Sequence, residues 1–160
     1  MTTEEIVAAT ALNSWKILIG RADKFFSALT DEQLQAEVAP GKNRLVYLWG
    51  HLIAVHDRMS PLFGIGEPLH PELDAPFLTE ADNRSAEYPS AADLKRWWDE
   101  VNNRLLTAFN GFSAADWAGP HTAVSAEAFA ANPLRNRLSV LIARTTHIDY
   151  HLGQAVLAKK

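Results

Sequence analysis

Residues 145–154 read Thr-Thr-His-Ile-Asp-Tyr-His-Leu-Gly-Gln and lie within a long helix-compatible run near the end of the chain. A helix turns about 100° per residue, so His147 and His151 point the same way, about 40° apart and one turn from each other. Two imidazoles presented in this way can chelate one metal ion. Taken alone, such a pair is more often exposed or hydrogen-bonded than part of a metal site, so a third ligand elsewhere decides the interpretation.

The sequence around this pair predicts the last of the long helices. Asn132-Pro133 is a favourable pair for an N-cap and first helical position, so we expect the helix to begin at Pro133 and to end at about Ala158. Lys159 and Lys160 would then complement its C-terminal dipole. Residues at three- and four-residue steps are expected to face inward: Leu134, Leu138, Leu141, Thr145, Ile148, Leu152 and Ala155.

Three more long helices are predicted upstream. The first should start near Thr2, which opens a capping box, and the second should run from about Asn43 to about Met59. The third should begin at Ser90, whose side chain is a typical N-cap. No strand-like alternation competes with this pattern. We therefore expect an all-α fold, a four-helix bundle that forms a single domain over residues 1–160.

Two stretches lack helical periodicity. Residues 64–90 are rich in prolines and glycines, which predicts a long irregular crossover between the second and third long helices. A loop of this length is uncommon in a compact domain and is often functional. Residues 119–132 form the second stretch that we expect to be irregular.

The composition limits the classes of function. The 160 residues include 48% apolar and 21% charged residues, carry a formal charge of −4 and contain no cysteine. The absence of a basic block argues against nucleic acid or an anionic membrane surface as a partner. Without cysteine, the chain has no disulfide, zinc–thiolate site or cysteine nucleophile. The acidic N-terminus is unlike a signal peptide, and no apolar run approaches the roughly 20 residues that span a bilayer, so we expect a cytoplasmic protein.

His51 is the third histidine that could join the pair. It lies in the middle of the second predicted helix on an apolar stripe, an unusual place unless its ring nitrogens are satisfied. The neighbouring Gly50 would allow another segment to approach closely. If the second and fourth helices face each other, His51 meets His147 and His151. Three neutral imidazoles with an open position form a catalytic type of site, which suits Zn, Ni, Cu or Fe.

The other three histidines are not expected to be metal ligands. His56 shares a stripe with Trp49, which indicates helix packing or the edge of a pocket. His70 and His121 lie beside prolines in irregular segments, and we expect both to be solvated. Trp49 is the one tryptophan expected beside the site rather than only in the core.

Two residues near His151 are candidates for an outer layer of the site. Gln154 lies about one turn beyond His151, and Tyr150 is adjacent to it. The sequence shows no strong candidate for a general base.

Several motifs together resemble one family. The segment His-x-x-x-His-Leu-Gly-Gln at 147–154 resembles the C-terminal signature of the DinB superfamily. Residues 40–52, which include Pro40-Gly41-Lys42-Asn43 and Leu48-Trp49-Gly50-His51-Leu52, resemble its first ligand motif. The segment Leu-Thr-Asp-Glu-Gln-Leu at 29–34 is also typical of it. The resemblance covers most of the chain and is weakest between residues 64 and 90.

The resemblance implies a fold, a metal and a kind of chemistry. It implies an up-down-down-up four-helix bundle with the long crossover after the second helix, and frequent homodimers. It also implies a divalent metal site, often nickel or zinc, with His51, His147 and His151 as ligands. Members with known activity depend on thiols, as bacillithiol-type S-transferases and mycothiol-dependent isomerases.

Three hypotheses of function follow. The leading one is a metal-dependent enzyme that acts on a small molecule, since a coordinated thiol or water has a lowered pKa. A low-molecular-weight thiol as co-substrate gives S-transfer, and water gives hydrolysis. The alternative is a non-catalytic helical bundle that binds a metal or a small ligand. The third is a purely structural bundle whose histidines are incidental.

Overall fold

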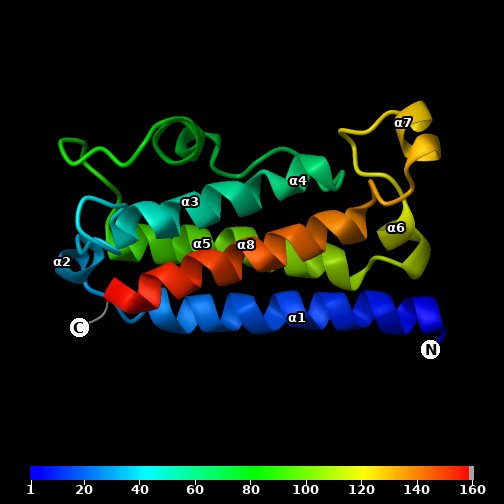
Figure 1. Cartoon of the computed structure of the whole chain (residues 1–160), viewed down its shortest axis with the longest axis horizontal. Coiled ribbons are helices and arrows are strands. Elements are labelled where there is room, and N and C mark those ends of the chain that lie inside the picture. The colour runs from blue at the N-terminus through cyan, green and yellow to red at the C-terminus, as the bar shows by residue number, and fades with distance from the viewer. Residues whose placement is uncertain (159–160) are drawn as a thin grey trace.

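The computed structural model describes residues 1–158, which form helices joined by loops, with two isolated bridges and no strand (Figure 1). In this part of the chain four helices are long: α1 (Thr3–Phe26), α3 (Leu45–Asp57), α5 (Ala91–Asn110) and α8 (Arg137–Ala158). The short ones are α2 (Asp31–Leu34), α4 (Met59–Leu62), α6 (Ala114–Ala118) and α7 (Ala126–Ala131). The prediction of an all-α fold is confirmed. Lys159 and Lys160, which were expected to complement the last helix dipole, lie outside the described residues.

The four long helices lie side by side along the longest axis of the molecule (Figure 1). Helix α1 packs against α5 and α8, and α3 packs against the same two helices. Lys16 of α1 bonds to Asn110 at the end of α5, while Asp23 pairs with Lys95 near its start, so α1 and α5 are antiparallel. Following the colours in Figure 1, α8 runs in the direction of α1, and α3 in the direction of α5.

Side-chain caps fix the starts of several helices. The side chains of Thr2, Thr30, Ser90 and Ser113 each accept a hydrogen bond from the backbone N–H three residues later. Each bond satisfies a donor that the first helical turn leaves without a partner. The predicted starts of the first and third long helices are therefore confirmed.

The predicted start of the last helix is wrong. Helix α8 begins at Arg137, and Leu134, which was expected to face inward, is 73% exposed. The Asn132 side chain accepts a hydrogen bond from the Leu134 N–H and so stabilises a turn. Asn136 takes the capping role instead, since its Oδ1 accepts a bond from the Ser139 N–H.

The two stretches expected to be irregular contain short helices. In the crossover, η1 is a 3₁₀ turn (Pro71–Leu73) and η2 is a π turn (Ala75–Thr79), and both pack against α3. The buried side chains of Leu73 and Phe77 provide the packing that stabilises these turns. Helix α7 lies in the second stretch. The second long helix also ends earlier than expected, at Asp57, and α4 continues after it.

The core lies between the long helices and is rich in aromatic side chains. Trp15, Trp49 and Trp98 are all fully buried, and Phe109 packs edge-on against Trp15. The core therefore accounts for the apolar stripes that the sequence shows.

None of the helices in residues 1–158 combines the length and the hydropathy that a membrane crossing needs.

Candidate metal centre

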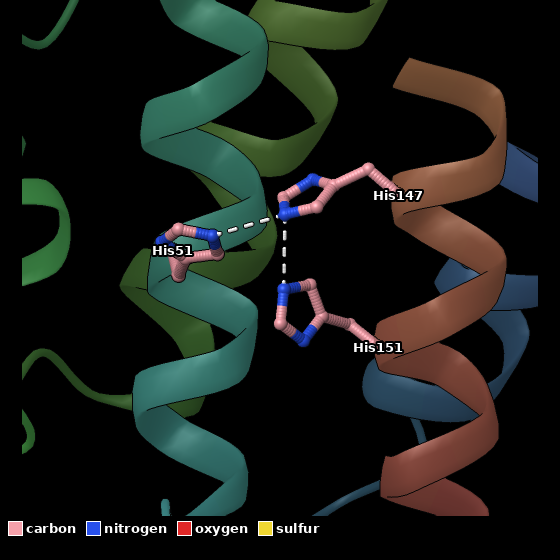
Figure 2. Close-up of side chains that lie close together, drawn as sticks. All are labelled: His51, His147 and His151. Carbon is pink, nitrogen blue, oxygen red and sulfur yellow. Dashed lines mark hydrogen bonds between the residues drawn. The ribbon is translucent and has the colours of Figure 1, made fainter. Parts of the chain in front are cut away.

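Helices α3 and α8 bring His51, His147 and His151 together. Figure 2 shows His51 projecting from α3 toward the two histidines of α8. The Nε2 atom of His147 lies 3.2 Å from Nε2 of His51 and 3.0 Å from Nε2 of His151. One nitrogen from each ring lies within 4.8 Å of the other two, and all three side chains are half-buried. The facing arrangement expected of the second and fourth long helices is therefore present.

The distances from the His147 nitrogen to the other two ring nitrogens fit coordination of one divalent ion. Two imidazole nitrogens bound to a tetrahedral ion at about 2.0–2.1 Å are separated by about 3.3 Å. The separations of 3.2 and 3.0 Å between the His147 nitrogen and those of His51 and His151 are close to this value. Three neutral nitrogen donors on one side of an ion also leave coordination positions open, as catalytic sites require.

Two of the rings, those of His147 and His151, are held in the neutral form that a metal ligand needs. Burial, together with the nearby His151, His51 and Arg144, lowers the pKa of His147 to about 4. Burial also lowers the pKa of His151. At neutral pH these two imidazoles therefore keep a lone pair available for a metal.

Outer hydrogen bonds orient two of the rings. The Nδ1–H of His51 donates to the carbonyl of Phe77 at 2.8 Å. The Nδ1–H of His151 donates to Oε1 of Gln154 at 2.9 Å, and the Gln154 amide donates to the Tyr150 hydroxyl at 3.2 Å. These bonds assign the proton to Nδ1, so the Nε2 lone pairs of both rings point into the cluster.

His147 is oriented differently. Its Nδ1 is buried and has no hydrogen-bond partner among residues 1–158. Its Nε2 nevertheless faces both of the other rings, which meet it at steep interplanar angles of 67° and 84°. Within residues 1–158 the His147 ring therefore contacts the other two rings but has no outer acceptor to orient it.

Gly50 explains how the crossover reaches His51. A Cβ atom built on Gly50 would lie 2.2 Å from the ring of Phe77, closer than real side chains come. The missing side chain lets the π turn of η2 press against α3, which brings the Phe77 carbonyl onto the His51 ring. The expectation that Gly50 permits a close approach is confirmed. Sequence reasoning missed Phe77 because a backbone carbonyl has no residue-specific pattern.

We expect Gly50→Ala to disturb both stability and metal affinity. The added methyl group would push Phe77 away, at a cost of about 1–3 kcal/mol in the free energy of unfolding. Loss of the carbonyl that orients His51 would weaken metal binding by roughly 10–100-fold. Urea unfolding and calorimetric titration with zinc measure the two effects.

Gly20→Ala is the matched control for this substitution. Gly20 also lies inside a long helix, but a Cβ there would meet nothing within 4 Å. Its replacement should leave zinc affinity unchanged and raise helix stability by up to about 1 kcal/mol. Equal zinc affinity in the Gly50→Ala and wild-type proteins would contradict the role given to Phe77.

Two of the candidate outer residues lie in the core. Trp49 is fully buried and stacks on Phe26. His56 is fully buried as well, and its Nδ1–H donates to Oδ1 of Asn102 at 2.9 Å. Within the described residues neither side chain hydrogen-bonds to the three histidines. Gln154 and Tyr150, by contrast, form the hydrogen-bonded chain that leads to His151.

His70 and His121 are less exposed than expected. The side chain of His70 is only 14% exposed and lies between Glu72 and Glu100, because the crossover folds back onto α5. His121 is half-buried in the loop after α6. The expectation that both are solvated is therefore wrong.

Two further residues lie beside the histidines. The ring of Tyr47 stacks on His51 at a centroid distance of 6.2 Å, and its hydroxyl donates to the Glu80 carbonyl. Arg144 lies one turn before His147 on α8, and its charge acts on that ring. The signal for both was their helical spacing, four residues before His51 and three before His147.

The fold and the site together define a helical protein with a candidate three-histidine centre for a divalent metal between two facing helices. The family model of the DinB superfamily matches residues 15–155, a span that includes all three histidines. The chain therefore belongs to the DinB superfamily, as its motifs predicted. A search of curated proteins found no match to this chain.

Proposed function

We propose that this chain is a metal-dependent enzyme that acts on a small molecule at His51, His147 and His151. The observation that carries the proposal is the convergence of three Nε2 atoms across α3 and α8, two of them on rings whose Nδ1–H is already bonded. Nickel and zinc are the proposed ions, since a set of imidazole donors suits both. The four long helices would form the up-down-down-up bundle that the superfamily resemblance implies.

The residues of the chain would divide the work at the site. The three Nε2 atoms would hold the ion, which when bound supplies Lewis-acid activation of a thiol or a water molecule. The Phe77 carbonyl and Gln154 hold two of the rings in the required tautomer. Tyr47 stacks on one side of His51 and would limit the access of solvent there.

A low-molecular-weight thiol is the proposed co-substrate, and S-transfer the proposed reaction, with hydrolysis as the second possibility. The chain contributes no thiol of its own, because it has no cysteine. The thiol, like a homodimeric state, is proposed on the superfamily resemblance.

One observation favours a second candidate function, capture of a metal or small ligand without turnover. Among residues 1–158 the candidate group contains histidines alone, and no carboxylate lies within it to serve as a general base. In this case the chain would bind its ligand and release it unchanged.

A turnover assay separates the two candidates. Untagged protein is loaded with zinc or nickel and tested for conjugation of cysteine to 1-chloro-2,4-dinitrobenzene and for hydrolysis of p-nitrophenyl esters. Activation of the thiol or the water molecule by the metal should raise one of these rates well above that of the metal-free protein. His147→Ala, treated identically, is the matched control. Full metal loading without turnover in a broad panel of thiols, electrophiles and esters would favour capture.

A further inference from the structure

Arg144 belongs to the same face of α8 as two of the histidines. Residues 144, 147 and 151 are separated by three and four positions, which places them within an arc of about 60° on the helix. Arg144 is half-buried, and its positive charge acts on both His147 and His56. It is therefore a neighbour of the candidate metal centre.

The guanidinium of Arg144 has no protein partner within residues 1–158. Its Nε is buried without a hydrogen bond, and burial is the sole cause that lowers its pKa. The other buried or half-buried arginines are all bonded. Arg44 pairs with Asp82, Arg104 donates to the Glu67 carbonyl, and Arg137 donates to the Asp116 carbonyl.

An unpaired arginine at this place is costly for the free protein. A partly buried charge without a counterion loses hydration and gains no compensating contact. Arg144 cannot favour a divalent cation at the neighbouring histidines, because like charges repel. The guanidinium charge therefore favours neither folding nor metal binding, and an anion from solution would supply the missing partner.

We propose that Arg144 binds the carboxylate of the small-molecule substrate whose other functional group reaches the three-histidine centre. The planar guanidinium presents paired N–H donors that match the two oxygens of a carboxylate. A single carboxylate also matches the local charge, since Arg144 is the one permanently charged group among those that act on His147 in residues 1–158. This inference rests on the proposed function and adds a substrate class to it.

The test compares acids with their neutral amides on the cobalt(II)-loaded full chain. The probes are mercaptoacetate, 3-mercaptopropionate and 4-mercaptobutyrate, each paired with its amide, and binding is followed by the thiolate-to-cobalt absorption band. A charge-assisted bidentate contact should make the best-fitting acid bind at least about tenfold more tightly than its amide. In Arg144→Gln this preference should shrink to within about twofold.

Three variants separate recognition from structure. Arg144→Lys keeps the charge but not the paired donors, so its preference should be intermediate. Arg21→Gln removes the same charge from an exposed position of α1 and should keep the wild-type preference. Cobalt affinity of Arg144→Gln should equal or exceed that of the wild type, because a repelling charge is gone.

Two outcomes would overturn the proposal. One is an equal acid-to-amide ratio in the wild type and Arg144→Gln, and the other is loss of cobalt binding in Arg144→Gln with the fold intact. Saturation-transfer NMR of 3-mercaptopropionate with metal-free protein gives a second measurement, and its signal should depend on Arg144. Failure of the proposed function would be recognised separately, because the wild-type protein would then bind no cobalt or show no turnover.

Discussion

Replacing His147 with alanine is expected to abolish stoichiometric metal binding. Its Nε2 is the atom that lies within 3.2 Å of the Nε2 atoms of both His51 and His151, so its loss opens the whole cluster. The affinity should fall by more than the roughly 10–100-fold that loss of an outer hydrogen-bond partner costs. His51→Ala and His151→Ala should behave alike. Elemental analysis of untagged protein and calorimetric titration with zinc or nickel measure the effect.

Stability provides a second readout of the same prediction. Zinc at 100 times its dissociation constant stabilises a folded protein that binds it by about 2.7 kcal/mol, and the three variants should lose this increment. His56→Gln is the control, because His56 is buried beside Asn102 and makes no hydrogen bond to the cluster within residues 1–158. It should keep full metal stoichiometry. Undiminished affinity in His147→Ala would refute the assignment of the ligands.

The metal-free protein is expected to lose stability steeply in mild acid. Burial lowers the pKa of His56 to about 3 and that of His147 to about 4, and it lowers the pKa of His151 as well. In the unfolded chain these imidazoles titrate near 6.5, so below this pH the unfolded state binds more protons than the folded state. The stabilising contribution of the neutral histidines is therefore fully present above about pH 7. It decreases as the pH drops toward the pKa values of the folded state.

The contribution of His56 can be measured alone. The pKa of His56 is about 3 in the folded protein. Because of this difference from the unfolded chain, the free energy of unfolding should fall by about 2 kcal/mol between pH 7.5 and pH 5. The Asn102 side-chain amide donates to the Trp98 carbonyl, so its oxygen faces His56 and holds the neutral ring by its Nδ1–H. Urea unfolding of chelator-treated protein at a series of pH values gives the slope.

His56→Gln should reduce this pH dependence by about the same 2 kcal/mol, because glutamine does not titrate. The comparison uses the change with pH, so a lower stability of the variant at pH 7.5 does not affect it. The window stops at pH 5, above the range in which carboxylates titrate. A wild-type protein and a variant with identical pH dependence would show that His56 is not held neutral by burial.

The helices and the three histidines could be predicted from sequence because both depend on local periodicity. Caps such as Ser90 mark the helix starts, and the apolar stripes show which side of each helix is buried. His51 on such a stripe and a pair of histidines one turn apart then indicate a shared site. The structure agrees with these patterns because α3 and α8 pack against each other with the histidine-bearing faces together.

Features that depend on tertiary contacts were not predictable in the same way. The turns η1 and η2 form because Leu73 and Phe77 become buried against α3, in a segment whose prolines indicate only irregular chain. The start of α8 depended on a competition between Asn132 and Asn136, both suitable caps. The unpaired state of Arg144 is likewise a property of its neighbours.

The contact of Phe77 with Gly50 and His51 would make the crossover a partner in the proposed metal binding at the histidines. The free energies of two events, ordering of the π turn on α3 and binding of an ion, are coupled, and such coupling is reciprocal. A change that loosens the crossover, near or far from Phe77, would lower the affinity of the centre by at most the factor by which ion binding favours the ordered crossover. The crossover at residues 64–90, where the family resemblance is weakest, can thus tune the metal affinity of the site that contains the most recognisable motif, at residues 147–154.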